Sequence, residues 1–207
     1  MSTALFIVDV QNDFTEGGAL GVEGGDDVAR RISEHVAAHR DDYVIVVASR
    51  DWHDGDNDNG GHFADGEPDF VDTWPVHCVA GTAGAEYDDH FDTTGVSHHL
   101  KKGRGEPAYS LFDGETDDGR TVVQLLEEHG VLDIDVVGIA EQVQSRLTEV
   151  AKAQPRALDL TVAVMGCVVN GPGEARETDI GLTGSKNVCS EGGCGACSVI
   201  VYSPNEP

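Results

Sequence analysis

One carboxylate and three imidazoles in the first half of the sequence have the types and spacing of metal ligands: Asp51, His53, His62 and His77. Asp51 and His53 are two residues apart, and the two other histidines follow in the same segment. Three nitrogen ligands and one oxygen ligand suit zinc or iron(II). Because a single D-x-H pair is weak evidence and most surface histidines are only solvated, the spacing alone leaves both a metal site and solvated side chains open.

A second group with chemical potential is the stretch CSEGGCGAC, which places Cys189, Cys194 and Cys197 at the spacing C-x4-C-x2-C. This is the plant-type spacing of a two-iron cluster, and glycines allow backbone amides to approach the sulfides. A cluster needs four ligands, and Cys167 or Cys78 supplies the fourth only if the fold brings it near. We therefore favour a Gly-rich turn that leads into a short strand at residues 198–202, and an iron–sulfur cluster is the less favoured cofactor.

Length and charge limit the kinds of protein this chain can be. A chain of 207 residues buries about 70% of its unfolded surface, which favours one domain with its own core. The formal net charge of −25 repels polyanions, so we expect neither nucleic acid nor an anionic membrane as a partner. Because the acidic residues are scattered, they are best interpreted as a solvated, salt-adapted surface.

Targeting and membrane signals are not evident in the sequence. The N-terminus has no basic leader, its apolar run is broken by Asp9, and no apolar stretch approaches the ~18 residues of a membrane span. We expect a cytoplasmic protein, whose five cysteines are reduced, metal-bound or catalytic. A homo-oligomer is compatible with the sequence.

The elements that must position these residues follow an alternating order. Apolar runs at residues 5–8, 43–48 and 135–139 predict buried strands, and Asp9, Asp51 and Ala140 follow them. Between the first two strands, residues 26–39 have the apolar spacing of a helix that Asp26 or Asp27 caps.

The same alternation continues along the chain. Residues 121–129 predict a helix that ends at Gly130, residues 141–153 predict another helix, and residues 158–165 predict a fourth strand. This order predicts a three-layer α/β/α fold with a mainly parallel sheet and an atypical C-terminal part. Ligands bind at the carboxyl ends of such strands, and residues 51–107, which lack periodicity, are expected to form the site there.

Several sequence motifs in residues 3–140 occur in the order typical of one family. The motifs are ALFIVDVQNDFTEGGAL, VVASRDWH, GHF, TWPVHC, KKG followed by AYSLF, and DVVGIA. In this region the chain resembles the nicotinamidase branch of the isochorismatase-like hydrolases. The resemblance implies a nicotinamidase-like amidohydrolase that converts nicotinamide to nicotinate and ammonia, with a small amide as its substrate.

The resemblance also implies roles for individual residues. Asp9 corresponds to the family's base and Lys102 to the lysine that supports it, while Asp51, His53, His62 and His77 correspond to the ligands of a divalent metal, zinc or iron. The family's aromatic substrate pocket corresponds to Phe14, Trp74 and Tyr109, and Ala140 lies beside the oxyanion-binding turn. Three extra residues between His53 and His62 depart from the family's commoner loop length.

The family's nucleophile is missing from its usual position. The family places a cysteine four residues after the alanine of GIA, whereas this chain reads GIAEQVQ, with Gln144 there. An amide cannot attack a carboxamide as a thiolate does, so the resemblance implies either an inactive protein or a displaced nucleophile. Cys167 is the candidate for a displaced nucleophile, because it follows the predicted strand at residues 158–165.

The C-terminal part of the chain resembles two other families. Residues 139–184, with IAEQVQSRL and LTVAVMGCVVNGPGEARETDIGLTG, resemble the C-terminal part of 4-hydroxy-3-methylbut-2-enyl diphosphate synthase, where Cys167 and Glu174 would be cluster ligands. The C-x-x-C that completes that cluster is not found upstream. Residues 182–201 resemble the ferredoxin-like loop of the xanthine dehydrogenase group.

These resemblances predict an isochorismatase-like domain at residues 1–166 and a Gly/Cys-rich tail at residues 167–207. Two alternatives to the hydrolase remain open. One is an iron–sulfur binding or electron-transfer module that uses the C-terminal cysteines. The other is a chimeric chain whose tail has no function.

Overall fold

The strands in the described part of the protein form one sheet that is parallel except at one edge. The computed structural model describes residues 2–139, 161–166 and 198–202. Within these residues the six-stranded sheet has the order β3-β2-β1-β4-β5-β6, and only β6 is antiparallel to its neighbour. The strands are β1 Thr3–Val8, β2 Ile45–Asp51, β3 His98–Lys102, β4 Asp133–Gly138, β5 Thr161–Gly166 and β6 Ser198–Tyr202. The predicted, mainly parallel α/β fold is confirmed.

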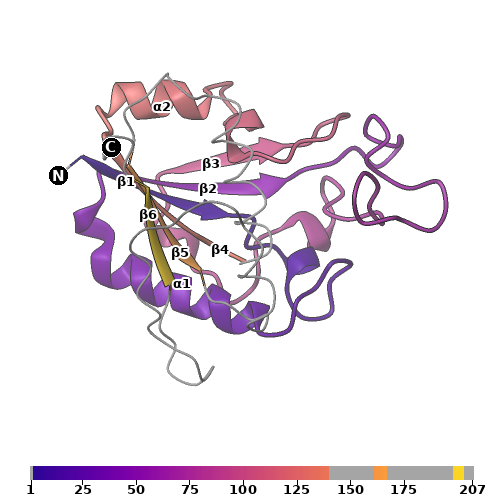
Figure 1. The fold of residues 1–207 in the computed structure, drawn as a ribbon, viewed down its shortest axis with the longest axis horizontal. Helices are drawn as coiled ribbons and strands as arrows, with labels where there is room; N and C mark the ends of the chain where they lie inside the picture. The colour runs from indigo at the N-terminus through magenta and orange to yellow at the C-terminus, as the bar shows by residue number, and fades with distance from the viewer. Residues whose placement is uncertain (1, 140–160, 167–197, 203–207) are drawn as a thin grey trace.

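Two helices cover opposite faces of this sheet. Helix α1, Gly25–His39, lies below the strands in Figure 1, and helix α2, Val122–Glu128, lies above them. The apolar positions predicted for α1, namely Val28, Ile32 and Val36, are buried. The protein therefore has the predicted order of layers, α/β/α.

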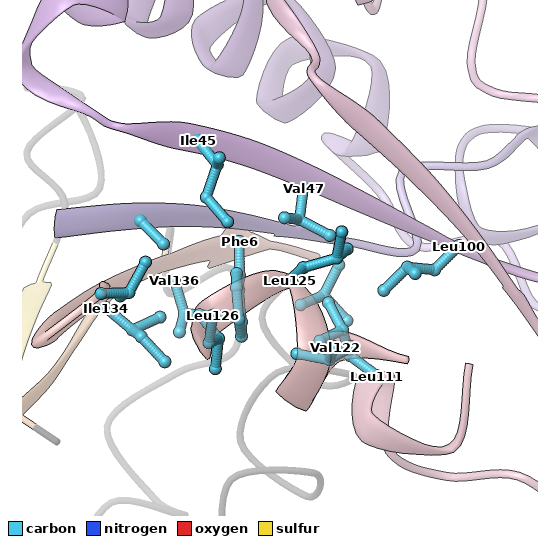
Figure 2. Close-up of a cluster of buried hydrophobic side chains, with 13 residues drawn as sticks. Phe6, Ile45, Val47, Leu100, Leu111, Val122, Leu125, Leu126, Ile134 and Val136 are labelled. Atoms are coloured by element: carbon cyan, nitrogen blue, oxygen red, sulfur yellow. The ribbon is translucent and has the colours of Figure 1, made fainter. Parts of the chain in front are cut away.

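The hydrophobic core has two parts because β1 is buried on both faces. Ala4, Phe6 and Val8 belong to the cluster on the α2 side, which Figure 2 shows around Phe6, and Leu5 and Ile7 belong to the cluster on the α1 side. Alternate side chains of a strand point to opposite faces, which accounts for this division. Burial of each large apolar side chain contributes about 1.5–3 kcal/mol, so the centre of the sheet is a rigid support.

The ends of the two helices agree only partly with the sequence prediction. Helix α2 begins after Thr121 with a capping box completed by Gln124, and Gly130 has the positive φ of 59° expected of a helix terminator. Helix α1 was predicted to be capped by Asp26 or Asp27, which is wrong. Its N-cap is Gly24, and the carboxylate of Glu16 accepts hydrogen bonds from the backbone N–H of Gly24 (2.6 Å) and Asp26 (2.7 Å).

Strand β3 was not predicted, because its sequence HHLKK lacks an apolar run. It lies within residues 51–107, which were expected to lack regular structure. Only Leu100 of this strand joins the apolar core, while the backbone pairs in parallel with β2 from Val47 to Asp51. A strand at the edge of the sheet needs few apolar side chains, which explains why periodicity missed it.

The C-terminal predictions are only partly covered by the described residues. The predicted strand at residues 158–165 corresponds to β5, and the short strand at residues 198–202 corresponds to β6. The helix predicted at residues 141–153 lies outside the described residues, and the division at residue 166 stays a prediction. In the described part of the chain, no helix combines the length and apolar character needed to cross a membrane.

Candidate active site

Three neighbouring strands place charged side chains at one edge of the sheet. Asp9 follows the end of β1, Asp51 ends β2, and Lys102 ends β3 opposite Asp51. The strands are parallel, so their carboxyl ends lie together, as the arrowheads of β1, β2 and β3 show in Figure 1. The sheet therefore brings together the acid and amine groups that the sequence separates.

Lys102 is a buried ammonium between two buried carboxylates. Its Nζ lies 3.1 Å from Oδ2 of Asp9 and also donates to Oδ1 of Asp51. Asp9 and Lys102 are 0% and 1% exposed. Charges can be buried at this depth only when they are paired and hydrogen-bonded, as these three groups are.

The backbone and a hydroxyl group fix the direction of the Asp9 carboxylate. Asp9 has a φ of 52°, in the left-handed region that residues other than glycine rarely adopt. The Oγ of Ser49, on β2, donates to Oδ1 of Asp9 at 2.7 Å. One carboxylate oxygen of Asp9 thus contacts the hydroxyl and the other contacts the ammonium.

The side-chain amide of Gln11 joins β2 to the site loop. Its Nε2 donates to the backbone oxygens of Asp51 (3.0 Å) and Ala85 (2.9 Å), and its Oε1 accepts from the backbone N–H of Asp51 at 2.8 Å. Gln11 is completely buried. It therefore fixes the end of β2, and with it the position of Asp51.

The three predicted metal-ligand histidines lie together and are buried. Ligand atoms of His53, His62 and His77 all lie within 4.8 Å of one another. Oδ2 of Asp51 lies 3.9 Å from Nε2 of His53 and 3.8 Å from Nε2 of His77. Asp51 therefore presents one oxygen to Lys102 and the other to the histidines.

Hydrogen bonds fix which ring nitrogen is available in two of these histidines. Nδ1 of His53 lies 2.9 Å from the carbonyl oxygen of Gly103, and Nδ1 of His77 lies 2.7 Å from that of Pro75. A carbonyl only accepts, so each Nδ1 carries the proton and each Nε2 has its lone pair free. Among the described residues, the buried Nε2 of His53 has no hydrogen-bond partner. An orphaned buried acceptor beside two more imidazoles and a carboxylate fits a bound divalent metal ion.

Burial keeps the three imidazoles neutral, which is the form that binds a metal ion. Burial lowers the pKa of His53 and of His77, and this effect exceeds that of the Asp51 carboxylate, which raises both pKa values. Burial lowers the pKa of His62 to about 4, and the two neighbouring imidazoles add to this effect. Nδ1 of His62 lies 3.2 Å from Oη of Tyr109, which leaves its other nitrogen available.

Gly103 allows the backbone to approach the ring of His53. Its φ is 81°, and a Cβ at this position would lie 2.5 Å from Cε1 of His53. A side chain here would displace the ring, so the glycine after Lys102 is required by the close approach.

An open cleft of about 400 Å³ is connected to the histidines through Phe14, one of its lining residues. Phe14, Phe70, Trp74 and Ile139 are among its lining residues, and the ring of Phe14 lies 5.7 Å from that of His77. The structure thus brings Phe14 and Trp74 to one cavity. Tyr109 contacts His62 instead, with ring centroids 5.4 Å apart, and Ala140 lies outside the described residues.

The cysteines are mostly outside the described residues. Cys167, Cys189, Cys194 and Cys197 fall there, as do Gln144 and Glu174. The described residues contain one cysteine, Cys78, which is fully buried, and its burial raises the pKa of the thiol well above the usual range. A protonated, buried thiol is not a nucleophile, so Cys78 does not replace the missing family cysteine.

Sequence reasoning missed three residues that support the site: Gln11, Asp13 and Ser49. The carboxylate of Asp13 accepts from the backbone N–H of Cys78 at 2.6 Å, next to His77, and the structure leaves no room for a Cβ at Gly84 beside it. For Ser49 and Gln11 the available signal was a polar residue inside or directly after an apolar run, since a buried polar side chain needs a specific partner.

Comparison with known protein families finds two matches along the chain. The model of the GcpE protein C-terminal domain matches residues 129–195. A 4-hydroxy-3-methylbut-2-en-1-yl diphosphate synthase (flavodoxin) of Rhodospirillum rubrum is 50% identical over 58 residues, which cover 28% of this chain and 14% of the relative. The predicted resemblance of this segment is confirmed, and it concerns a short piece of the synthase.

The larger match covers the strands and loops described above. A nicotinamidase/pyrazinamidase of Mycobacterium tuberculosis is 47% identical over 137 residues, 66% of this chain and 71% of the relative. A solved pyrazinamidase of Pyrococcus horikoshii in complex with zinc superposes with a TM-score of 0.53 at 32% identity, covering 67% of this chain and 71% of that chain. The isochorismatase domain model matches residues 3–144, more than half of the sequence. The chain therefore belongs to the isochorismatase family.

Proposed function

We propose that this chain is a nicotinamidase-type amidohydrolase, which binds a small heteroaromatic carboxamide such as nicotinamide beside a divalent metal ion. The observation that carries the proposal is the buried group Asp9–Lys102–Asp51, which adjoins three neutral imidazoles, one of which contacts Phe14 in the wall of an aromatic cleft. The names of its relatives, a nicotinamidase/pyrazinamidase and a pyrazinamidase in complex with zinc, support the substrate class and the metal.

The chain's own residues have distinct tasks in this reaction. Asp9 takes the proton from an attacking thiol, and Lys102 is the cation paired with its carboxylate. The sulfur bonds to the amide carbon, ammonia leaves with the proton held by Asp9, and water hydrolyses the resulting thioester to release the acid and the thiol. Asp51, His53, His62 and His77 would hold a metal ion, which would supply Lewis-acid chemistry to the site.

The attacking thiol is the step for which the sequence departs from the family. Gln144 occupies the position of the family's cysteine, so we assign the attack to Cys167. This residue directly follows β5, whose carboxyl end lies at the same edge of the sheet as that of β1, two strands away. Without this thiol the site would bind the amide and the metal ion but would not hydrolyse the amide.

Ammonia release from nicotinamide tests the proposal on the purified, zinc-loaded full chain. We expect release by the wild type, loss of release of at least a hundredfold with Cys167→Ala, and no change with the matched control Cys197→Ala. Zinc content, measured on the same samples, should fall in His53→Ala and stay unchanged in both cysteine variants.

The outcomes separate the parts of the proposal. A wild type that binds zinc and nicotinamide but releases no ammonia would be a binding protein, and the assignment of hydrolysis would be wrong. If the wild type binds neither zinc nor nicotinamide, the whole proposal is wrong.

A further inference from the structure

Phe70 combines two features that folding does not favour. Its φ is 57°, in the left-handed region, and 56% of its surface is exposed. A bulky residue pays a steric penalty at positive φ, and a ring that remains largely in water gains little from burial. Strain of this kind gathers at functional sites, and the other non-glycine residues with positive φ include Asp9 and Cys78, both in the region described above.

A hydrogen-bonded turn holds Phe70 in this conformation. Its backbone N–H donates to the oxygen of Thr73 at 3.0 Å. Oδ1 of Asp69 accepts from the backbone N–H groups of Val71 (2.9 Å), Asp72 (3.0 Å) and Thr73 (2.9 Å). A backbone hydrogen bond and the carboxylate of Asp69 thus both stabilise the turn, which fixes the backbone position of Phe70.

The ring of Phe70 lies against Trp74 at the cleft. The two ring centroids are 6.0 Å apart with an interplanar angle of 85°, an edge-to-face arrangement, and both residues line the cleft together with Phe14. Backbone hydrogen bonds connect Trp74 to the metal-ligand segment: its N–H donates to the oxygen of His62 at 2.9 Å, and its oxygen accepts from Ala64 at 3.0 Å. The aromatic pair is therefore held at a fixed place relative to the histidines.

Exposure alone does not distinguish Phe70 from the apolar residues near it in the sequence. Val71 is 74% exposed and Val76 is 59% exposed, but neither lines the cleft. Of these three exposed side chains, Phe70 alone combines positive φ, contact with Trp74 and a place in the cleft wall.

We propose that Phe70 is a specificity-determining residue, whose ring forms the outer aromatic wall of the cleft and selects planar heteroaromatic carboxamides over saturated ones. This inference rests on the proposed function, because it names the part of the ligand that the cleft recognises. Aromatic rings prefer edge-to-face and offset contacts with one another, which a saturated ring cannot reproduce.

Calorimetric titration of the zinc-loaded full chain tests this role with two probes, nicotinamide and cyclohexanecarboxamide. Phe70→Gly removes the ring and relieves the strain, because glycine adopts positive φ freely. We expect nicotinamide to bind about two- to tenfold more weakly to this variant, from the usual strength of an aromatic pair, while its Tm changes little, because the relief of strain offsets the lost contact with Trp74. The affinity for cyclohexanecarboxamide should change less.

Two further variants complete the experiment. Phe70→Tyr should keep the wild-type preference for nicotinamide, and the matched control Val71→Ala should leave both affinities unchanged. Unchanged nicotinamide affinity in Phe70→Gly would overturn the inference while leaving the proposed function intact. An equal loss for both probes together with a lower Tm would show a structural role and would also overturn it. A wild type that does not bind nicotinamide would remove the proposed function, and this inference with it.

Discussion

At the scale of single residues, the most unusual feature is the ammonium of Lys102 in the interior. Its two partners, Asp9 and Asp51, face different parts of the site: we propose Asp9 as the base, and Asp51 also faces the histidines. The lysine therefore joins the carboxylate of Asp9 to the carboxylate that lies beside the histidines. Removal of one member of such a group leaves buried charge without compensation.

Lys102→Met should destabilise the protein strongly. We expect the free energy of unfolding to fall by about 3–5 kcal/mol, because the two carboxylates would remain buried without their cation. The adjacent variant Lys101→Met is the matched control, and it should lose much less stability, because solvent screens the ion pair of Lys101 with the exposed Asp117. Urea denaturation measures both, and equal losses would contradict the role assigned to the buried pair.

The sequence predicted the charged residues and histidines of the candidate site better than the polar residues that hold them in position. Asp9, Asp51, Lys102 and the three histidines were predicted as one site, and they lie together. Gln11 and Ser49 were not predicted, because their partners are backbone groups or side chains on other strands. Such partners are set by strand register, which a linear pattern does not contain.

At the scale of elements, periodicity predicted the strands and helices whose apolar faces are continuous. It missed β3, which contributes Lys102 to the site and buries only one apolar side chain in the core. It also misplaced the cap of α1, because Glu16 reaches the helix end from an earlier turn. Both errors concern elements that neighbouring segments stabilise, so local propensity was insufficient.

A histidine connects helix α1 to the sheet and should make stability depend on pH. Nε2 of His35 lies 3.0 Å from Oη of Tyr43, which donates to Asp135 on β4 at 3.0 Å. Burial lowers the pKa of His35 below its usual 6.5, and the nearby imidazole of His39 lowers it further. The carboxylates of Asp135 and Asp42 act in the opposite direction but have smaller effects than burial. The unfolded chain therefore binds a proton more readily than the folded protein. Stability from this group is present above pH 6.5 and is lost as pH falls below that value.

The variant His35→Gln tests this dependence. We expect the difference in Tm between the wild type and the variant to shrink as pH is lowered from about 7.5 to about 5.5, because only the wild type carries the depressed pKa. Calorimetric melts at several pH values measure it. Two parallel curves of Tm against pH would show that His35 does not contribute in this way.

At the scale of the whole molecule, two family matches share one sheet. The isochorismatase match ends at residue 144 and the GcpE match begins at residue 129, so the two overlap at β4. Strand β5 lies within the second match and pairs with β4 from Asp133 to Gly138. The sheet thus continues across the change in sequence similarity, and β6 pairs with β5 at its edge.

Truncation tests whether this edge strand matters to the protein. A chain that ends at residue 197 lacks β6, and we expect its Tm to fall by about 5 °C or more, with increased light scattering, because β5 becomes an exposed edge. A chain that ends at residue 202 keeps β6 and is the matched control. If both truncated proteins behave like the full chain, the alternative of a tail without function is supported instead.

The amide of Gln11 has a consequence for how the polypeptide leaves the sheet. Strand β1 ends at Val8, and the backbone turns away at Asp9. The backbone N–H and oxygen of Asp51, at the end of β2, are nevertheless hydrogen-bonded, because the side-chain amide of Gln11 offers the same donor and acceptor as a peptide group. The side chain of Gln11 thus makes the hydrogen bonds that a neighbouring strand would otherwise make with the end of β2. The main chain can therefore bend at Asp9, whose carboxylate faces inward, while the end of β2 keeps its hydrogen bonds.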